Sequence, residues 1–292
     1  MFFFADHNPI AVFAYYIATV TIIMFTQSPV LVFLSLLGAL IHFFMQNKTA
    51  KYSTEAYFLL LFIITALINP IFSHKGQTVL LVINNAPITL EAILYGFFAA
   101  AMLMASIYWF RALSTVMTSD KLLYVFGKFS PKLSLILSMA LRYVPLFTRQ
   151  AKKTRDAQKA LGIYNEDNVI DRSQSGVRVF SVMVSWALEN GITTADSMSA
   201  RGYGVAKRTH FSIFKFTKSD FFLLLSTLLL FLLTALAVAF GALEFEFYPQ
   251  IKAPSPSWLS FLGYISYGAL IILPTFIDAK ENIKWHYLRS KI

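Results

Sequence analysis

The chain has 292 residues, of which 57% are hydrophobic and 14% are charged, and its formal net charge is +10. Soluble domains have about 25% charged and 45–50% apolar residues, so a soluble protein of this composition would have to bury far too much apolar surface. A bilayer removes this problem, because lipid then surrounds the apolar side chains. The sequence contains no cysteine, which excludes disulfides and thiolate metal sites.

Six apolar segments are predicted to be membrane-spanning helices, which need about 20 apolar residues. They are Pro9–Thr26, Pro29–Met45, Ala56–Phe72, Ile88–Phe110, Phe221–Leu243 and Trp258–Ile277. The first two are short and are joined only by Gln27 and Ser28, so they are either tilted or do not both cross fully. The run Thr78–Ile83 is too short to span, and with Asn84–Pro87 it is interpreted as an outer loop or a shallow re-entrant segment.

The positive charge is concentrated in the block Arg111–Lys218, which has 17 Lys and Arg against 7 Asp and Glu. The positive-inside rule therefore predicts that this block is cytoplasmic. The acidic stretch Glu244–Pro256 is then expected outside. Further cytoplasmic markers are Lys48 and Lys51 before the third span and, at the C-terminus, Lys280, Lys284, Arg289 and Lys291. Six spans with both termini in the cytoplasm satisfy all of these charges.

Three regions follow from this pattern: an N-terminal transmembrane region 1–110, a cytoplasmic helical region 111–218 and a C-terminal transmembrane region 219–292. Within the cytoplasmic region, hydrophobic periodicity predicts helices over Lys121–Phe129, Lys132–Leu161 and about Gln174–Arg201. In the last of these, Val177, Phe180 and Val184 belong to one apolar helical face.

The two longer cytoplasmic helices are predicted to end in similar tripeptides, Ala160-Leu161-Gly162 and Ala200-Arg201-Gly202. Glycine suits the residue after a helix, where a positive φ is needed. The helix dipole stabilises the charge of Arg201, and its guanidinium would project as a fork for a carboxylate on a partner. The alternative is that Arg201 has no partner-binding role and only stabilises the end of its helix through a favourable interaction with the helix dipole. Two ends of similar form suit a partner that itself has two equivalent halves.

Enzyme signatures are missing from the sequence: it has no phosphate-binding glycine-rich loop, no HExxH and no Gly-x-Ser-x-Gly. The histidines, which are not spaced as metal ligands, are interpreted as interfacial or loop residues; they are His7, His42, His74, His210 and His286. Glu91 lies near the outer interface in the first turn of a span. It is either a functional acid in the membrane or a charge that the helix dipole stabilises.

A set of segments resembles a known family, the transmembrane T component of energy-coupling factor (ECF) transporters, which is related to permease subunits of cobalt, nickel and biotin uptake systems. The segments are Ile88–Ala92, Ser119–Leu123, Met139–Pro145, Asp156–Gly162, Ala195–Gly204, and Arg208 with Thr209. The resemblance covers most of the chain and is densest over Ile88–Thr209. As a set these segments are specific, and singly only the Ala-Arg-Gly-Tyr-Gly end is.

The resemblance implies an all-α fold, with a membrane bundle of about six spans and long cytoplasmic coupling helices. It also implies a non-catalytic subunit, without a cofactor, in the plasma membrane of a prokaryote. Two ABC ATPase subunits and a membrane-embedded substrate-binding S component would be its partners, and nucleic acid would not. The subunit would pass ATPase movements to the S component in an importer of vitamins or micronutrients.

In that family each coupling helix ends in an Ala-Arg-Gly-type motif that enters a groove on one ATPase. The resemblance places one motif on Ala200, Arg201 and Gly202, and the other on Ala160, Leu161 and Gly162. Here Leu161 stands where arginine is usual, so this end either binds by apolar docking or relies on Lys159. The surface for the S component is expected at Val177, Phe180, Val184, Leu137 and Leu141, and its alternative role is packing between the coupling helices.

Two other functions are compatible with the sequence. An ordinary ABC importer permease with its own substrate path would need polar residues deep in several spans. The last two spans offer only hydroxyl side chains: Ser226, Thr227, Thr234, Ser260, Ser266 and Thr275. The other alternative is a basic membrane scaffold that binds anionic lipid or a phosphorylated substrate.

Overall fold

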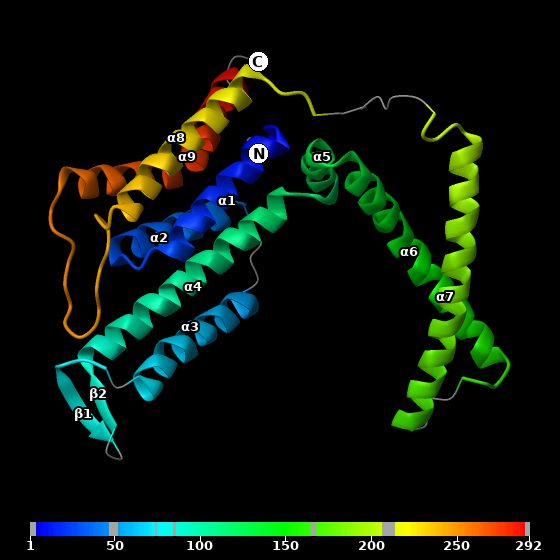
Figure 1. The fold of residues 1–292 in the computed structure, drawn as a ribbon, viewed down its shortest axis with the longest axis horizontal. Helices are drawn as coiled ribbons and strands as arrows, with labels where there is room; N and C mark the ends of the chain where they lie inside the picture. Colours follow the sequence, from blue (N-terminus) through cyan, green and yellow to red (C-terminus); the bar gives the residue numbers. More distant parts are fainter. Residues whose placement is uncertain are drawn as a thin grey trace. The chain divides into compact units, whose positions relative to one another are not determined.

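The structure is a computed structural model that describes residues 4–46, 52–73, 75–83, 86–164, 168–205 and 214–289 (Figure 1). Two compact units make up the chain. Met1–Leu122 and Phe214–Ile292 form the first, here called the membrane unit, and Leu123–Ile213 form the second, here called the insert unit. The described residues are all-α apart from one two-stranded sheet, which confirms the predicted fold class.

The membrane unit contains the apolar helices. Its elements are a 3₁₀ turn at Phe4–Asp6, α1 (Pro9–Phe25), α2 (Pro29–Gln46), α3 (Tyr52–Phe72), β1 (Val79–Ile83), β2 (Ala86–Thr89), α4 (Leu90–Val116), α8 (Lys218–Ala239) and α9 (Trp258–Arg289). Among the described residues, α2, α3, α4, α8 and α9 are long and apolar enough to cross a membrane, whereas α1 has only 17 residues. The protein is therefore a multi-pass membrane protein. As predicted, the first apolar segment forms a short helix.

The insert unit is built from α6 (Pro131–Ala160) and α7 (Val169–Ala200), and α5 (Ser119–Phe129) lies across the boundary between the two units. Helix α6 continues through Pro145 without interruption. The boundaries of 110/111 and 218/219 that the charge pattern predicts remain a prediction. Helix α4 reaches Val116, because apolar residues continue past Arg111 and this arginine pairs with Glu55 of α3.

Local sequence explains where the membrane helices begin. At α1, the side chain of Asn8 accepts a hydrogen bond from the Ile10 amide, and Pro9 occupies the first turn, where its missing N–H is not needed. At α8, Thr217 and Asp220 form a capping box, in which each side chain accepts from the other residue's backbone amide. These caps satisfy amides that the first helical turn leaves without partners.

The run interpreted as an outer loop or a shallow re-entrant segment forms an antiparallel hairpin of β1 and β2, in which Val82 pairs with Pro87. Its β-branched residues suit a strand. The carboxylate of Glu91 accepts a hydrogen bond from the Thr78 amide at 3.2 Å, so this buried acid holds the start of the hairpin against α4.

Several residues used in the sequence analysis lie outside the described residues, namely Lys48, Lys51, His74, Asn84, Asn85, Arg208, Thr209, His210 and Lys291.

The core of the membrane unit is aromatic and partly polar. Tyr15, Tyr16, His42 and Trp109 are fully buried, and the Tyr16 hydroxyl lies 2.7 Å from Nε2 of His42. Gln46 contacts the same imidazole nitrogen at 2.8 Å. The interpretation of His42 as an interfacial or loop residue is therefore wrong, because α2 turns this side chain into the bundle rather than toward the bilayer surface.

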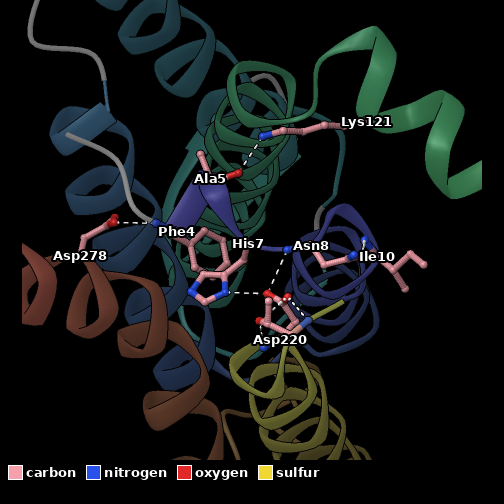
Figure 2. A network of polar contacts seen from close by, with 9 residues as sticks. Phe4, Ala5, His7, Asn8, Ile10, Lys121, Asp220 and Asp278 are labelled. Carbon is pink, nitrogen blue, oxygen red and sulfur yellow. Dashed lines mark hydrogen bonds and ion pairs between the residues drawn. The ribbon is translucent and has the colours of Figure 1, made fainter. Parts of the chain in front are cut away.

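The N-terminal segment is tied to three helices by polar contacts (Figure 2). The Phe4 amide donates to Asp278 of α9 at 2.8 Å, and Nδ1 of His7 lies 2.7 Å from Asp220 of α8. The ammonium of Lys121 on α5 donates to the Ala5 carbonyl at 2.7 Å. These contacts join the start of the chain to segments up to 274 residues away.

Candidate functional site

The first predicted tripeptide ends α6 in a Schellman motif. The Gly162 amide donates to the Lys159 carbonyl at 3.1 Å, and the Ile163 amide donates to the Gln158 carbonyl at 3.0 Å. Leu161 is the C-cap residue, and Gly162 has a φ of 65°. An ideal Cβ on Gly162 would meet nothing within 4 Å, so glycine is needed for its backbone conformation and not for space.

The second tripeptide ends α7 with the same hydrogen bonds. The Gly202 amide donates to the Ser199 carbonyl at 3.0 Å, and the Tyr203 amide donates to the Met198 carbonyl at 3.0 Å. Arg201 is the C-cap residue, and Gly202 has a φ of 78°. The two ends are therefore equivalent in backbone geometry and differ in the side chain that the cap position presents.

Both ends are open to the surroundings. Every residue of the two tripeptides is exposed, and Leu161 has 72% of its surface accessible. Within the described part of the chain, the Arg201 guanidinium makes no ion pair or hydrogen bond. Lys159, in contrast, lies with its ammonium 5.1 Å from the centre of the Tyr164 ring, a cation–π distance. The exposed side chain at the first tip is thus leucine, and the one at the second is arginine.

Helices α6 and α7 cross as an antiparallel pair (Figure 1). The Tyr143 hydroxyl lies 2.8 Å from that of Thr194, and Phe147 packs edge-on against Trp186 with ring centres 5.5 Å apart. Because the residue numbers of the contacts rise in α6 as they fall in α7, the two C-terminal tips lie at opposite ends of the pair. The arrangement presents two helix ends of equivalent backbone geometry at opposite ends of one helix pair.

The apolar face predicted on the insert is exposed in this structure. Val177 is 64% accessible, Phe180 is 68% and Val184 is 42%, while Leu137 and Leu141 of α6 are 39% and 43% accessible. The contacts given above between α6 and α7, Tyr143 with Thr194 and Phe147 with Trp186, use other side chains, and both roles for this face stay predictions. The exposed side chains of the face remain available to lipid or to another protein.

The sequence interpretation missed the inner face of α7. Its buried residues, Ser175 and Val179, precede the half-buried Trp186, Asn190 and Thr194, and successive spacings along this face are four or seven residues. Serine, asparagine and threonine interrupt the hydrophobic signal along this face, so the more apolar outer face dominated the pattern. The i, i+4 spacing of Ser175 and Val179, continued to Trp186, is the signal that was present.

The described residues contain no group of three or more His, Asp or Glu side chains placed to hold a metal ion.

The polar side chains in the last two spans, α8 and α9, form hydrogen bonds with other groups of the protein. The Thr234 and Ser266 hydroxyls lie 2.9 Å apart, and Ser260 donates to the Ala242 carbonyl at 2.7 Å. The hydroxyls of Ser226, Thr227 and Thr275 donate to backbone carbonyls of their own helices.

Sequence comparisons give relatives of this chain. The sequence profile of the CbiQ family, described as cobalt transport protein, matches residues 3–211. The chain is 31% identical over 106 residues to the energy-coupling factor transporter transmembrane protein EcfT of Lactobacillus helveticus, a match covering 34% of this chain and 38% of the relative. It is 31% identical over 105 residues to EcfT 1 of Listeria monocytogenes, covering 35% and 38%. The match thus spans little more than a third of the length of these curated relatives.

Proposed function

Because the chain belongs to the CbiQ family of cobalt transport proteins, we propose that it is the transmembrane coupling subunit of an ATP-driven importer of the energy-coupling factor class. The subunit does not hydrolyse ATP. It passes the movement of two ABC ATPase subunits through α6 and α7 to a membrane-embedded S component. The transported substrate is a vitamin or another micronutrient that the S component binds, and the insert and both termini face the cytoplasm.

The main support is the equivalence of the two helix ends. Two ATPase subunits present two equivalent docking grooves, and α6 and α7 present two exposed tips with the same Schellman geometry. In this proposal each helix end stays docked while the ATPase groove moves. The movement of the groove is then passed to the whole helix as a rigid-body displacement. In this proposal the charged tip at Arg201 meets a carboxylate, and the tip at Leu161 docks in an apolar pocket.

The exposed face on the insert supports a contact with the S component. Phe180 and Val177 are about two-thirds accessible on a helix that also carries both polar and charged residues. An apolar surface of this kind suits a partner that slides along it, since apolar contacts are non-directional. Leu137 and Leu141 extend the same type of surface onto α6.

An importer permease with its own substrate path is the alternative function. Such a path needs polar groups that can exchange protein partners for substrate. The hydroxyl pair Thr234 and Ser266 and the hydroxyl of Ser260 already have partners within the protein. This favours a scaffold over a path through α8 and α9.

Co-purification tests the proposal. The tagged chain is expressed with the ABC ATPase subunits encoded near it, and separately alone. We expect two ATPase subunits to be retained per chain, with ATP hydrolysis only in the complex. ATP binding is then measured on the chain alone, where none is expected because no phosphate-binding loop exists in the sequence. Stoichiometric binding of ATP by the isolated chain, or failure to retain any ATPase, would contradict the coupling function.

A further inference from the structure

A groove of about 620 Å³ lies between α8, α9 and the N-terminal segment, within the membrane unit. One wall is apolar and includes Phe222 of α8 and Phe276 of α9, each 66% accessible. The lining also includes two lysines, Lys215 and Lys280, here called the rim lysines. This combination of an apolar wall and a cationic rim has no role in the coupling of helices to ATPases.

Two of the three acids that line the same groove have partners within the protein. Asp220 accepts hydrogen bonds from the Asn8 and Thr217 amides, and it pairs with His7 (Figure 2). Glu281 lies 3.8 Å from the ammonium of Lys284. Among the described residues the third acid, Asp6, forms no ion pair or hydrogen bond through its carboxylate; burial lowers the pKa of the nearby Lys121, and Asp6 opposes that shift.

The two rim lysines, by contrast, have no partner among the residues that the structure describes. Across the described ranges of the chain, Lys215 and Lys280 form neither an ion pair nor a hydrogen bond, and both are exposed. The Ser219 hydroxyl in the same groove also makes no hydrogen bond there. The groups left to bind a ligand are therefore the two lysines, the Ser219 hydroxyl and the Asp6 carboxylate, whose net charge is positive and complements an anion.

The depth of these groups matches the layers of a phospholipid. Phe222 is the fifth residue of α8, which begins three residues after Lys215, and Phe276 precedes Lys280 by four residues within α9. At 1.5 Å per residue, Phe276 lies about 6 Å from Lys280 along α9, and Phe222 lies about 6 Å from the start of α8. Lysine ammoniums at helix ends extend to the headgroup level, and aromatic rings at this depth face the start of the acyl chains.

We propose that this groove binds one anionic glycerophospholipid, with its phosphate at Lys215 and Lys280 and an acyl chain against Phe222 and Phe276. The bound lipid bridges α8 and α9 where the N-terminal segment is attached. The site needs only the membrane placement of α8 and α9, so it does not depend on the ATPase partners.

Native mass spectrometry of the purified full chain tests the site. The chain is equilibrated with phosphatidylglycerol and phosphatidylcholine that have the same acyl chains, and the bound ratio is measured. A lysine near a membrane surface contributes about fivefold to the binding of anionic lipid, so Lys215→Gln with Lys280→Gln should lower the ratio about 25-fold. The matched control is Lys75→Gln with Lys252→Gln, which changes the net charge equally in the loops at the other end of the helices and should leave the ratio unchanged.

Two further arms distinguish a bound lipid from a free phosphate ester held by the lysines alone. Phe276→Ala should weaken both lipids and leave their ratio unchanged, because it removes only acyl contacts. Glycerol phosphate, which has the headgroup chemistry without acyl chains, should not displace the bound lipid. An unchanged ratio in the groove variant, an equal loss in the control variant, or displacement by glycerol phosphate would each overturn the proposal.

Discussion

The guanidinium of Arg111 on α4 lies 3.0 Å from the carboxylate of Glu55 on α3. The Tyr108 hydroxyl donates to the same carboxylate at 2.5 Å. The guanidinium also lies over two rings, 4.1 Å from the centre of Phe43 and 4.5 Å from that of Phe58. Helix α3 presents mostly exposed apolar residues, so this polar cluster is a main fixed point between α3 and the rest of the bundle.

Replacing Glu55 should therefore weaken the attachment of α3. Glu55→Ala leaves the Arg111 charge between aromatic rings without its carboxylate, and we expect the free energy of unfolding to fall by about 1.5–3 kcal/mol. The measurement is reversible unfolding in mixed micelles. Arg111→Leu and the double variant complete the cycle. If the two single effects add to within about 0.5 kcal/mol in the double variant, the residues are not coupled and the cluster has no such role.

Gly96 on α4 is expected to tolerate no side chain. A Cβ there would lie 2.5 Å from the Ala66 carbonyl oxygen of α3, and a backbone atom cannot move aside as a flexible side chain would. Gly96→Ala should cost about 1–3 kcal/mol of unfolding free energy, through displacement of α3. Gly176→Ala is the matched control, because a Cβ at this position of α7 meets nothing within 4 Å. Equal stability of the two variants would contradict the close approach of α3 and α4.

The sequence allowed the helices to be predicted because each apolar run is a local signal. The capping residues also lie next to the helices they begin, as Thr217 does before α8. The positive φ of Gly162 and Gly202 followed from the same local chemistry. The apolar length needed to cross a bilayer is likewise set within each segment. These features require no knowledge of how distant segments pack.

The contacts between distant segments could not be predicted in this way. His7 meets Asp220 across 213 residues, and Tyr16 meets His42 only because α1 and α2 turn the two side chains inward. A single sequence gives each residue's chemistry but not its partner. The hairpin of β1 and β2 was missed for a related reason: a short apolar run is ambiguous until pairing with a second strand is known.

The orientation of the insert is tested by labelling single cysteines, which is direct because the native chain has none. Ser173→Cys lies on exposed α7, and Ser255→Cys lies in the exposed loop before α9. In intact cells an impermeant thiol reagent should label Cys at 255 and not at 173, since the basic insert is expected inside. Labelling of the Ser173→Cys variant from outside would reverse the proposed topology.

The two helix tips should respond differently to substitution. Arg201→Ala removes one partner of a proposed charge pair, and such a loss typically weakens binding by about 2–5 kcal/mol, much of it from leaving the other charge unpaired. Arg201→Glu should weaken ATPase attachment further, through like-charge repulsion. Arg149→Ala is the matched control, because it removes an exposed arginine from the middle of α6 and leaves both tips unchanged.

Leu161→Ala should act through apolar area alone. We expect a loss of about 1–3 kcal/mol in ATPase attachment that is nearly independent of salt, whereas the Arg201 effect should shrink as salt screens the pair. Binding of the ATPase subunits to the detergent-solubilised chain, measured at low and high salt, separates the two. The Schellman turns at Gly162 and Gly202 are left intact by all these variants, so helix geometry is not altered. If Arg201→Ala leaves assembly and transport unchanged in the reconstituted complex, Arg201 is only a helix cap, and the charged contact does not exist.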